Sequence, residues 1–382
     1  MENSVVAFAP GRVELLGNHT DYNEGLVLAA AIDLGVTVRA EKLNADVIEV
    51  SSETNGREVS VSLKNLERLK HEPWANYPIG VIKILREAGF EIGGLRLRVS
   101  SNLPLGSGLS SSAAFEVATA VAALELFGLS IEPMALAQLC QKAENQFVGV
   151  RCGLLDQASS VFGKEGEVIL LDFRAITART VPLSPGVALL LVDSGVPHQL
   201  IGGEYNERRS QCQAAAAALG VKALRDVTSE AVSSASLDPL ISARALHITG
   251  EDERVLAGVA ALASGQMEEF GQLMFQSHES SRRNFENSTA FLDALVEIAA
   301  TIRGVLGARL TGGGFGGSTI WLVERDKTQE ILSRVAEAYR QKTEATCKAL
   351  ITKASQGARL VGEHRPNPQK SCQDRSDELI AD

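Results

Sequence analysis

The stretch Leu103-Pro-Leu-Gly-Ser-Gly-Leu-Ser-Ser-Ser-Ala-Ala114 joins a predicted strand to a predicted helix. Gly106 and Gly108 allow the backbone to approach a ligand closely, and Ser110 is a residue type that commonly begins a helix. The free N–H groups and the positive dipole at a helix start attract phosphate. No Lys-Ser or Lys-Thr pair follows the glycines, so this is not a Walker A loop, and Mg²⁺ or a distant side chain must supply the counter-charge. Taken alone, the stretch fits a phosphate site and an ordinary serine-capped helix equally well.

On both sides of this loop the chain mixes strands and helices without the regular spacing of βαβ units, which favours an α+β fold. Apolar runs that are continuous or alternate with polar residues predict strands at Val5–Ala9, Val36–Ala40, Val47–Ser51, Val59–Leu63, Leu95–Ser100, Glu167–Asp172, Val187–Asp193, Ala308–Thr311 and Ser318–Glu324. Helices are predicted at Tyr77–Ala88, from Ser110 onward, and at Pro133–Phe147, Gly153–Phe162, Glu204–Leu219, Asp252–Ser264, Met267–Ser277, Ala290–Ile302 and Asp326–Lys342.

Two domains are expected, because 382 residues with 45% hydrophobic content can fill two cores. Pro182, Pro185 and Gly186 mark a border, so we expect domains at 1–184 and 185–361. The polar segment 362–382 is expected to be a flexible tail outside the fold.

The charge and the cysteines narrow the classes of function. A net charge of -10 argues against non-specific binding to nucleic acid or to an anionic membrane. The 5 cysteines form no C-x-x-C pair and suggest neither disulfides nor a zinc site. The N-terminus has no basic region followed by a long apolar run, and the most apolar helical stretch is interrupted by Glu116 and Glu125. We therefore expect a cytoplasmic protein with small-molecule partners and no membrane or nucleic-acid partner.

A second motif, Gly11-Arg-Val-Glu-Leu-Leu-Gly-Asn-His-Thr-Asp-Tyr-Asn-Glu-Gly25, places many hydrogen-bonding side chains in a predicted turn between two apolar strands. Its members are Arg12, Asn18, His19, Asp21 and Tyr22. Such a set suits a polyhydroxylated ligand, because each hydroxyl needs a partner when it leaves water. The alternative is a solvated surface loop, but the apolar strands on both sides favour a position near the core.

Two carboxylates, Glu144 and Asp156, flank a glycine-containing turn. One could hold Mg²⁺ while the other takes or orients the proton of an attacking hydroxyl. On spacing alone this is a weak signal, because most acidic pairs twelve residues apart have no joint function.

A glycine-rich segment, Gly312-Gly-Gly-Phe-Gly-Gly317, lies between two predicted strands. Glycine in regular structure costs roughly 0.5–1 kcal/mol per residue, so a close approach of this backbone to a ligand or to another loop is the favoured reason. A flexible hairpin is the alternative.

Together these four segments resemble the galactokinase branch of the GHMP kinases, the family of galactose, homoserine, mevalonate and phosphomevalonate kinases. The resemblance extends to Trp74-Ala-Asn-Tyr77, Asp193-Ser-Gly-Val-Pro-His198, Glu204-Tyr-Asn-Glu-Arg-Arg209, Ser277-His-Glu-Ser280 and Gly357-Ala358, and so covers residues 5–361. Gly11-Arg-Val, His19-Thr-Asp-Tyr22 and the Asp193 segment are specific to galactokinases, whereas the serine and glycine loops belong to the whole family.

The resemblance implies a GHMP kinase fold of two lobes with the active site between them. The N-terminal domain would be of the ribosomal-protein-S5-domain-2-like type and the C-terminal domain ferredoxin-like. It also implies that Asp156 accepts or orients the proton of the anomeric hydroxyl of galactose, while Arg12 stabilises the negative charge that develops. The product would be galactose 1-phosphate.

The remaining site residues follow from the same resemblance. ATP would be the phosphate donor, with Mg²⁺ held by Ser112 and Glu144 and with Trp74 near the adenine. The loop around the phosphates would consist of Gly106, Ser107, Gly108, Leu109, Ser110, Ser111 and Ser112. The sugar-binding positions would be Asn18, His19, Asp21, Gly153 and Tyr205, together with Asp156.

The chain departs from the galactokinase pattern at four positions. Asn18 stands where the family usually has Glu, whose carboxylate accepts a hydrogen bond from the 6-hydroxyl of the sugar. Because an amide is uncharged and can also donate, we hypothesise a more permissive C6 side that admits a uronic acid or a 6-deoxy sugar. Glu14 replaces the usual Asn, and Asn145 and Ser288 replace the usual His and Cys, for which the sequence offers no explanation.

Two alternatives to a galactokinase stay open at this point. One is a related sugar 1-kinase with altered C6 specificity, for example one acting on galacturonate. The other is a non-catalytic sugar-sensing regulator, which the retention of Arg12, Glu144 and Asp156 argues against because a sensor needs no base. We expect the protein to act as a monomer.

Overall fold

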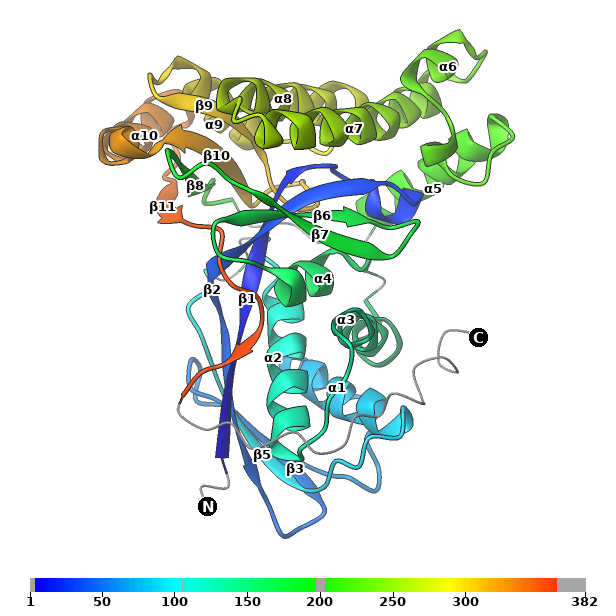
Figure 1. Ribbon diagram of the computed structural model, residues 1–382, viewed down its shortest axis with the longest axis vertical. Helices are drawn as coiled ribbons and strands as arrows, with labels where there is room; N and C mark the ends of the chain where they lie inside the picture. Colours follow the sequence, from blue (N-terminus) through cyan, green and yellow to red (C-terminus); the bar gives the residue numbers. More distant parts are fainter. Residues whose placement is uncertain (1–3, 105, 107, 151, 197–202, 363–382) are drawn as a thin grey trace.

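The computed structural model describes residues 4–104, 106, 108–150, 152–196 and 203–362. Within these residues the strands form two sheets, one of eight strands and one of four (Figure 1). The larger sheet has the order β12-β1-β2-β5-β3-β4, with β6 and β7 continuing from β2, and the smaller has the order β11-β8-β10-β9. The predicted mixed α+β class is confirmed. Ser107, predicted in the phosphate loop, and the predicted tail from residue 363 onward lie outside the described residues.

The strands are β1 (Ser4–Leu16), β2 (Leu26–Lys42), β3 (Val47–Ser52), β4 (Glu58–Ser62), β5 (Leu95–Ser101), β6 (Glu167–Asp172), β7 (Thr177–Pro182), β8 (Val187–Asp193), β9 (Val305–Leu310), β10 (Ser318–Glu324), β11 (Lys348–Thr352) and β12 (Arg359–Leu360). The α-helices are α1 (Asn76–Glu87), α2 (Ser111–Leu126), α3 (Pro133–Lys142), α4 (Leu155–Phe162), α5 (Glu204–Ala218), α6 (Ser229–Ser234), α7 (Pro239–Ala263), α8 (Met267–Ser280), α9 (Ala290–Thr301) and α10 (Thr328–Thr343).

The larger sheet is built on β1 and β2, which pair antiparallel from Ser4 opposite Glu41 to Leu16 opposite Leu28. Their register shifts between Pro10 and Arg12, which is the kind of irregularity that redirects a side chain next to a site. Helices α1 to α4 lie together on one side of this sheet (Figure 1). Successive side chains of a strand point to opposite faces of the sheet, so apolar side chains face these helices and polar side chains face the other way.

The smaller sheet is buried on both faces. Leu190 of β8 and Trp321 of β10 belong to a cluster with Tyr339 of α10. The alternate residues of the same strands, including Leu189 and Leu322, belong to the larger core cluster. Continuous apolar runs in β8 and β10 follow from this double burial. Helices α7 and α8 run side by side above the sheet (Figure 1).

The chain passes from the larger sheet to the smaller between Pro182 at the end of β7 and Val187 at the start of β8. It returns near its C-terminal end, where Leu360 of β12 pairs with Ala7 of β1. The domain border predicted between residues 184 and 185 stays a prediction.

Two predicted element boundaries were wrong in ways that bear on function. β1 extends to Leu16, so Arg12 lies in a strand and not in the turn that follows. Helix α7 begins at Pro239 and not at Asp252, with Asp238 accepting a hydrogen bond from the Leu240 N–H at its start. The first half of α7 buries Arg244, His247 and Glu251. A helix is predicted from apolar residues that recur every three to four positions, and polar residues on the buried face interrupt this pattern. Strands β7, β11 and β12 and the short helix α6 were not predicted.

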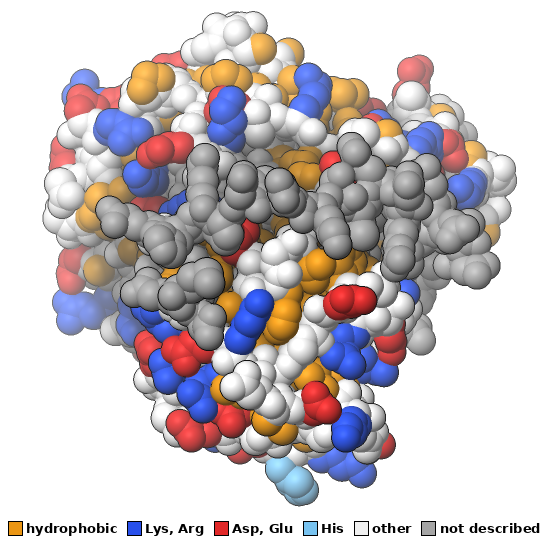
Figure 2. Space-filling model, turned by 60° about the horizontal axis from the view of Figure 1, so that its bottom comes forward, with side chains coloured by type: hydrophobic (Ala, Val, Ile, Leu, Met, Phe, Trp, Pro, Cys, Tyr) orange, Lys and Arg blue, Asp and Glu red, His pale blue; other side chains and the backbone are white. Residues whose placement is uncertain are grey.

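The surface carries charges of both signs. Acidic and basic side chains lie next to one another over the face shown in Figure 2. In the part of the chain that the structure describes, no helix combines the length and the apolar character that a membrane crossing requires.

Candidate active site

Arg12 and Asp156 form an ion pair where β1 meets the first turn of α4. Nε and Nη2 of Arg12 both donate to Oδ1 of Asp156, at 2.8 and 2.7 Å. Nη1 of Arg12 donates to the Gly108 carbonyl at 2.6 Å. The Arg12 side chain is 7% exposed and that of Asp156 is 27% exposed, so a ligand can reach the carboxylate. The structure thus brings the predicted catalytic pair together beside the predicted phosphate loop.

In the predicted phosphate loop, three of the described residues have the backbone conformation of a tight turn. Gly106, Gly108 and Ser110 have positive φ angles of 71°, 73° and 60°. A Cβ at Gly11 would lie 2.6 Å from the Leu109 carbonyl, so only glycine lets β1 pass this close to the loop. The Ser110 hydroxyl is buried and lacks a hydrogen-bond partner among the described residues. Since α2 begins at Ser111, its first N–H groups lie at the end of this loop.

Glu144 lies in a π-helical turn after α3, Ala143–Val148, where its carboxylate is hydrogen-bonded to Ser112. Burial raises the pKa of Glu144 to about 7, and the negative charge of Asp156 adds to the effect. Nε2 of Gln157 donates to Glu144 at 2.8 Å and to Glu116 at 3.0 Å. The structure therefore brings the two predicted metal ligands, Ser112 and Glu144, into contact.

The residues present fit Mg²⁺. Hydroxyl and carboxylate oxygens are its preferred ligands, and it commonly takes one or two carboxylates with phosphate oxygens and water in the other positions. Oε1 of Glu116 and Oε1 of Gln157 are buried and have no hydrogen-bond partner among the described residues. Within the same residues no three His, Cys, Asp or Glu side chains converge as a metal cage. This arrangement suits a cation that is completed by a phosphate ligand.

His19 lies in an aromatic cluster above the end of β1. Its ring centroid is 5.1 Å from that of Tyr205, and Tyr22 lies 5.5 Å from Tyr205. Nε2 of His19 lies 3.0 Å from the Gly313 carbonyl and Nδ1 lies 2.9 Å from the Tyr22 hydroxyl. A carbonyl can only accept, so Nε2 carries the proton and Nδ1 accepts from Tyr22. Burial lowers the pKa of His19 to about 4, so its imidazole is neutral near pH 7.

Asp21 lies against Gly153, the residue before the turn into α4. A Cβ at Gly153 would overlap Oδ2 of Asp21, so the two predicted sugar-binding positions meet only because residue 153 is glycine. Burial raises the pKa of Asp21 to about 7, with further contributions from the negative charges of Glu14 and Asp156. The structure thus places His19, Asp21 and Gly153 in one group that includes Asp156.

Asn18 is buried, and all four hydrogen-bonding positions of its amide are taken by protein atoms. Nδ2 donates to Oε1 of Glu14 and to the Gly312 carbonyl, each at 2.9 Å. Oδ1 accepts from Nδ2 of Asn287 at 2.8 Å and from the Ser281 hydroxyl at 3.4 Å. These bonds hold the loop after β1 to the second half of the chain, and they leave the amide no position for a sugar hydroxyl.

The glycine-rich segment after β9 closes the site from the other side. The Gly312 carbonyl accepts from Asn18, and the Gly313 carbonyl accepts from His19. A Cβ at Gly312, where φ is 79°, would lie 3.1 Å from the Gly108 carbonyl. The prediction that this backbone approaches another loop is confirmed, and the loops it approaches are those predicted to hold phosphate and sugar.

Trp74 lies just before α1, in the short helical turn Pro73–Ala75. Its Nε1 donates to Oε2 of Glu72 at 2.6 Å. Helix α1 packs against the turn that carries Glu144. Trp74 therefore lies just before a helix that contacts the Glu144 turn. Its predicted position near the adenine stays a prediction.

Five residues that support the site were not predicted from the sequence: His247, Glu251, Asp252, Ser277 and Arg309. Glu251 accepts from the N–H groups of Gly17 and Asn18, and Arg309 donates to Glu14 at 2.9 Å. His247 and Glu251 are four residues apart and therefore lie on the same face of a helix, a spacing that could have indicated these two residues. The sequence pattern did not show it because α7 was predicted to begin at Asp252, after both residues.

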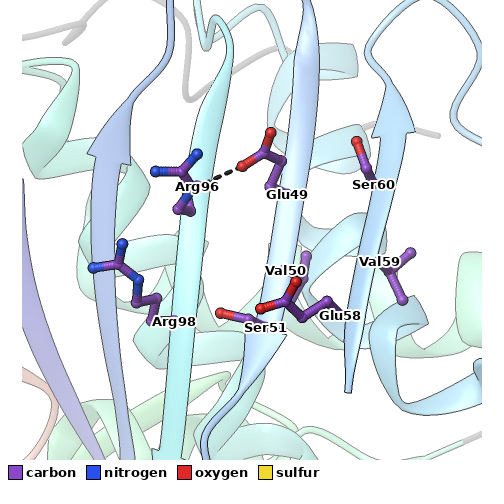
Figure 3. Close-up of a pocket in the computed structure, with 8 residues that line it drawn as sticks. All are labelled: Glu49, Val50, Ser51, Glu58, Val59, Ser60, Arg96 and Arg98. Atoms are coloured by element: carbon purple, nitrogen blue, oxygen red, sulfur yellow. Dashed lines mark hydrogen bonds and ion pairs between the residues drawn. The ribbon is translucent and has the colours of Figure 1, made fainter. Parts of the chain in front are cut away.

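A separate hollow of about 520 Å³ lies on the outer face of β3, β4 and β5 and contains none of the predicted site residues (Figure 3). Among its charged side chains, Arg96 pairs with Glu49 at 2.7 Å, and Arg98 pairs with Glu41, which does not line the hollow, at 2.9 Å. It is lined by Glu49, Val50, Ser51, Glu58, Val59, Ser60, Arg96 and Arg98.

Family models match three segments of the chain. A galactokinase galactose-binding signature matches residues 1–42, a GHMP kinases N terminal domain matches residues 76–164, and a GHMP kinases C terminal domain matches residues 259–341.

Whole-length relatives agree with these models. The galactokinase of Roseiflexus sp. (strain RS-1) is 41% identical over 370 residues, which cover 95% of this chain and 94% of that protein. The galactokinase of Haemophilus influenzae (strain ATCC 51907 / DSM 11121 / KW20 / Rd) is 40% identical over 365 residues, 94% of this chain and 95% of that protein.

Among solved structures, Lactococcus lactis galactokinase complexed with galactose superposes with a TM-score of 0.90 at 32% identity, covering 94% of this chain and 95% of that one. Methanococcus jannaschii mevalonate kinase shares the fold, with a TM-score of 0.66 at 19% identity and coverage of 92% and 98%.

Proposed function

The chain belongs to the galactokinase family of the GHMP kinases, and we propose that it transfers the γ-phosphate of ATP to the anomeric hydroxyl of galactose to give galactose 1-phosphate. The observation that carries the proposal is the Arg12–Asp156 pair, with Nη1 of Arg12 on the Gly108 carbonyl of the phosphate loop. Asp21 lies against Gly153 and is near enough to Asp156 for the charge of Asp156 to raise its pKa, so a sugar held there would present a hydroxyl to the Asp156 carboxylate.

Asp156 accepts or orients the proton of the anomeric hydroxyl in this proposal. Arg12 neutralises negative charge on the attacking oxygen and on the phosphoryl group that moves to it. Because Arg12 is held by Asp156 and by the Gly108 carbonyl, its guanidinium needs little reorganisation when the charge develops. Ser112 and Glu144 would hold Mg²⁺, which neutralises phosphate charge when it is bound. The described loop residues Gly106 and Gly108–Ser112 would surround the phosphates.

The sugar is assigned to His19, Asp21, Gly153 and Tyr205. The two aromatic rings and the Asp21 carboxylate offer an apolar surface and an acceptor side by side, as sugar sites require. Asn18 holds the loop in place in this assignment and does not touch the sugar, because its amide is already fully hydrogen-bonded.

The C6 side of the sugar is where specificity should differ from the family pattern. A saturated Asn18 amide gives no acceptor to a 6-hydroxyl, so removing that hydroxyl should cost little. We expect 6-deoxygalactose to be phosphorylated with a kcat/KM within about tenfold of that for galactose, since a lost productive hydrogen bond would cost more. A much larger gap would refute this assignment of Asn18 and leave the galactokinase proposal standing.

The function is tested with the purified chain, ATP, Mg²⁺ and galactose. We expect sugar-dependent ADP release and a single sugar phosphate, whose position at C1 is read from its ¹H and ³¹P NMR spectra. ADP release that does not depend on galactose, or phosphate on a different carbon, would contradict the proposal. Action as a cytoplasmic monomer stays a prediction, which chromatography with light scattering and localisation of the tagged protein would test.

A further inference from the structure

Glu251 of α7 is a buried carboxylate that holds the backbone of the loop Gly17–Gly25, here named the sugar loop. It is 0% exposed. Oε2 accepts from the Gly17 N–H at 2.7 Å, from the Asn18 N–H at 2.9 Å and from the Ser277 hydroxyl at 3.0 Å. Oε1 accepts from Nε of Arg254 at 2.7 Å. The carboxylate therefore has four protein donors, two of which are consecutive backbone amides of the sugar loop.

Two neighbours on α7 hold the same loop at other points. Nε2 of His247 lies 3.1 Å from the Asn18 carbonyl, to which it must donate. Oδ1 of Asp252 accepts from the Leu26 N–H at 2.7 Å, at the start of β2. Helix α7 thus binds the N–H and C=O groups of Asn18 and the N–H of Leu26, the residue that follows the loop, although it lies more than 200 residues away in the sequence.

The loop needs such support because it contains strained backbone. His19 directly follows Asn18 and has a φ of 61°, a region that L-residues with a side chain seldom occupy. This conformation turns the His19 ring toward Tyr205 and the Gly313 carbonyl. Hydrogen bonds that backbone N–H groups donate to an ionised carboxylate are among the stronger ones in proteins. Here they hold the two residues just before the strained position.

Glu251 stays ionised in this environment. Burial alone would raise its pKa, but the positive charges of Arg254 and Arg309 and the hydrogen bond from the Asn18 N–H lower the pKa below its ordinary value. A stable negative charge thus lies beneath the loop.

We propose that Glu251 is a positioning residue of the sugar site, which fixes the backbone at Gly17 and Asn18 so that His19 and Asp21 are preformed for the sugar. This inference rests on the proposed function for the identity of the ligand. Glu251 touches no reacting group, so its effect is on sugar binding and only indirectly on phosphoryl transfer.

The test compares Glu251→Gln with Glu253→Gln, the same change at a neighbouring position of α7. The first weakens the charge-assisted bonds to the loop, and the second alters an exposed carboxylate that accepts from the Ser229 N–H. For Glu251→Gln we expect the KM for galactose to rise about tenfold or more, with the KM for ATP and kcat within about threefold. For Glu253→Gln we expect the galactose KM to stay within about threefold of the unchanged chain. Equal galactose KM values in the two variants would overturn the proposal.

Amide hydrogen exchange gives a second readout that needs no activity. In Glu251→Gln the peptide that covers residues 17–25 should exchange faster than in Glu253→Gln, while a peptide from β10 should be unchanged. Unaltered protection of residues 17–25 would overturn the inference. If Glu251→Gln does not fold, Ser277→Ala can replace it, because this change removes one donor that orients the Glu251 carboxylate. The exchange of residues 17–25 is then measured in Ser277→Ala, with faster exchange expected. A failure of the unchanged chain to phosphorylate galactose would count against the proposed function alone, since the exchange result does not depend on it.

Discussion

Nδ2 of Asn18 donates a hydrogen bond to Oε1 of Glu14 across 2.9 Å, and the same oxygen accepts from Nη1 of Arg309 at 2.9 Å. The galactokinase pattern has the opposite residue types at these two positions, Asn at 14 and Glu at 18. The two departures noted in the sequence are therefore one exchange of a carboxylate and an amide between hydrogen-bonded neighbours. The exchange keeps one negative charge beside Arg309, which is fully buried.

A double-mutant cycle tests this relationship. Glu14→Asn leaves the Arg309 charge buried without a carboxylate and should lower the free energy of unfolding by about 3–5 kcal/mol. Asn18→Glu alone places a second carboxylate against Glu14 and should also destabilise. The double variant keeps one carboxylate in the pair, so we expect it to recover at least about half of the summed loss in urea unfolding experiments. Strictly additive losses would show that the two positions act independently.

Asp156→Asn should remove most of the activity and leave the fold intact. The amide has nearly the shape of the carboxylate, but it neither takes a proton nor pairs with Arg12 as an ion. A loss of about 10²–10⁴-fold in kcat is expected from the removal of a general base, measured as sugar-dependent ADP release. The melting temperature serves as the control for folding. An undiminished kcat would defeat the assigned mechanism and leave the family assignment untouched.

Tryptophan fluorescence can test the predicted adenine position. The chain has 2 tryptophans, Trp74 and Trp321. Trp321 is fully buried in the core of the smaller sheet, whereas Trp74 is only partly buried. Addition of ATP should change the emission of the unchanged chain, and Trp74→Phe should abolish that change while Trp321 still reports folding. A response that survives in Trp74→Phe would place the adenine elsewhere.

Gly153→Ala should impair the sugar site through a steric overlap. Its Cβ would collide with Oδ2 of Asp21, so Asp21 or the turn before α4 must move. We expect the KM for galactose to rise at least about tenfold, as displacements of this size at binding positions commonly cost. Gly186→Ala is the matched control, because a Cβ there would meet only the Ser184 hydroxyl at 3.5 Å. Similar KM values for both variants would argue against the assigned sugar position.

Asp252 makes the stability of the protein depend on pH. Burial raises its pKa from 3.8 to about 7. A carboxyl group with a raised folded-state pKa stabilises the fold at low pH, and this contribution is lost as the pH rises from about 4 through about 7. The full shift corresponds to a contribution on the order of 4 kcal/mol. Relative to the unchanged chain, Asp252→Asn should therefore become progressively more stable between pH 5 and pH 8 in urea unfolding experiments. A stability difference that does not change with pH would refute this protonation state.

The sequence alone was sufficient for much of the architecture. Apolar runs located the first half of β1, part of the second half of β2 and the full lengths of β8 and β10. Serine and glycine signals located the start of α2. These patterns depend on neighbouring residues only. The first half of α7 escaped prediction because its buried face carries His247 and Glu251, whose partners are in the sugar loop.

For this protein, the sequence alone identified the candidate site residues and the family. It indicated the predicted phosphate loop, the Arg12 and Asp156 side chains and the glycines of the glycine-rich segment. Only the tertiary structure decided how each group is used. It bound the Asn18 amide entirely to protein atoms and placed Glu251 under the sugar loop, 234 positions away from Gly17. Such assignments depend on which distant donors and acceptors packing brings within 3 Å, and local sequence patterns carry no information about that distance.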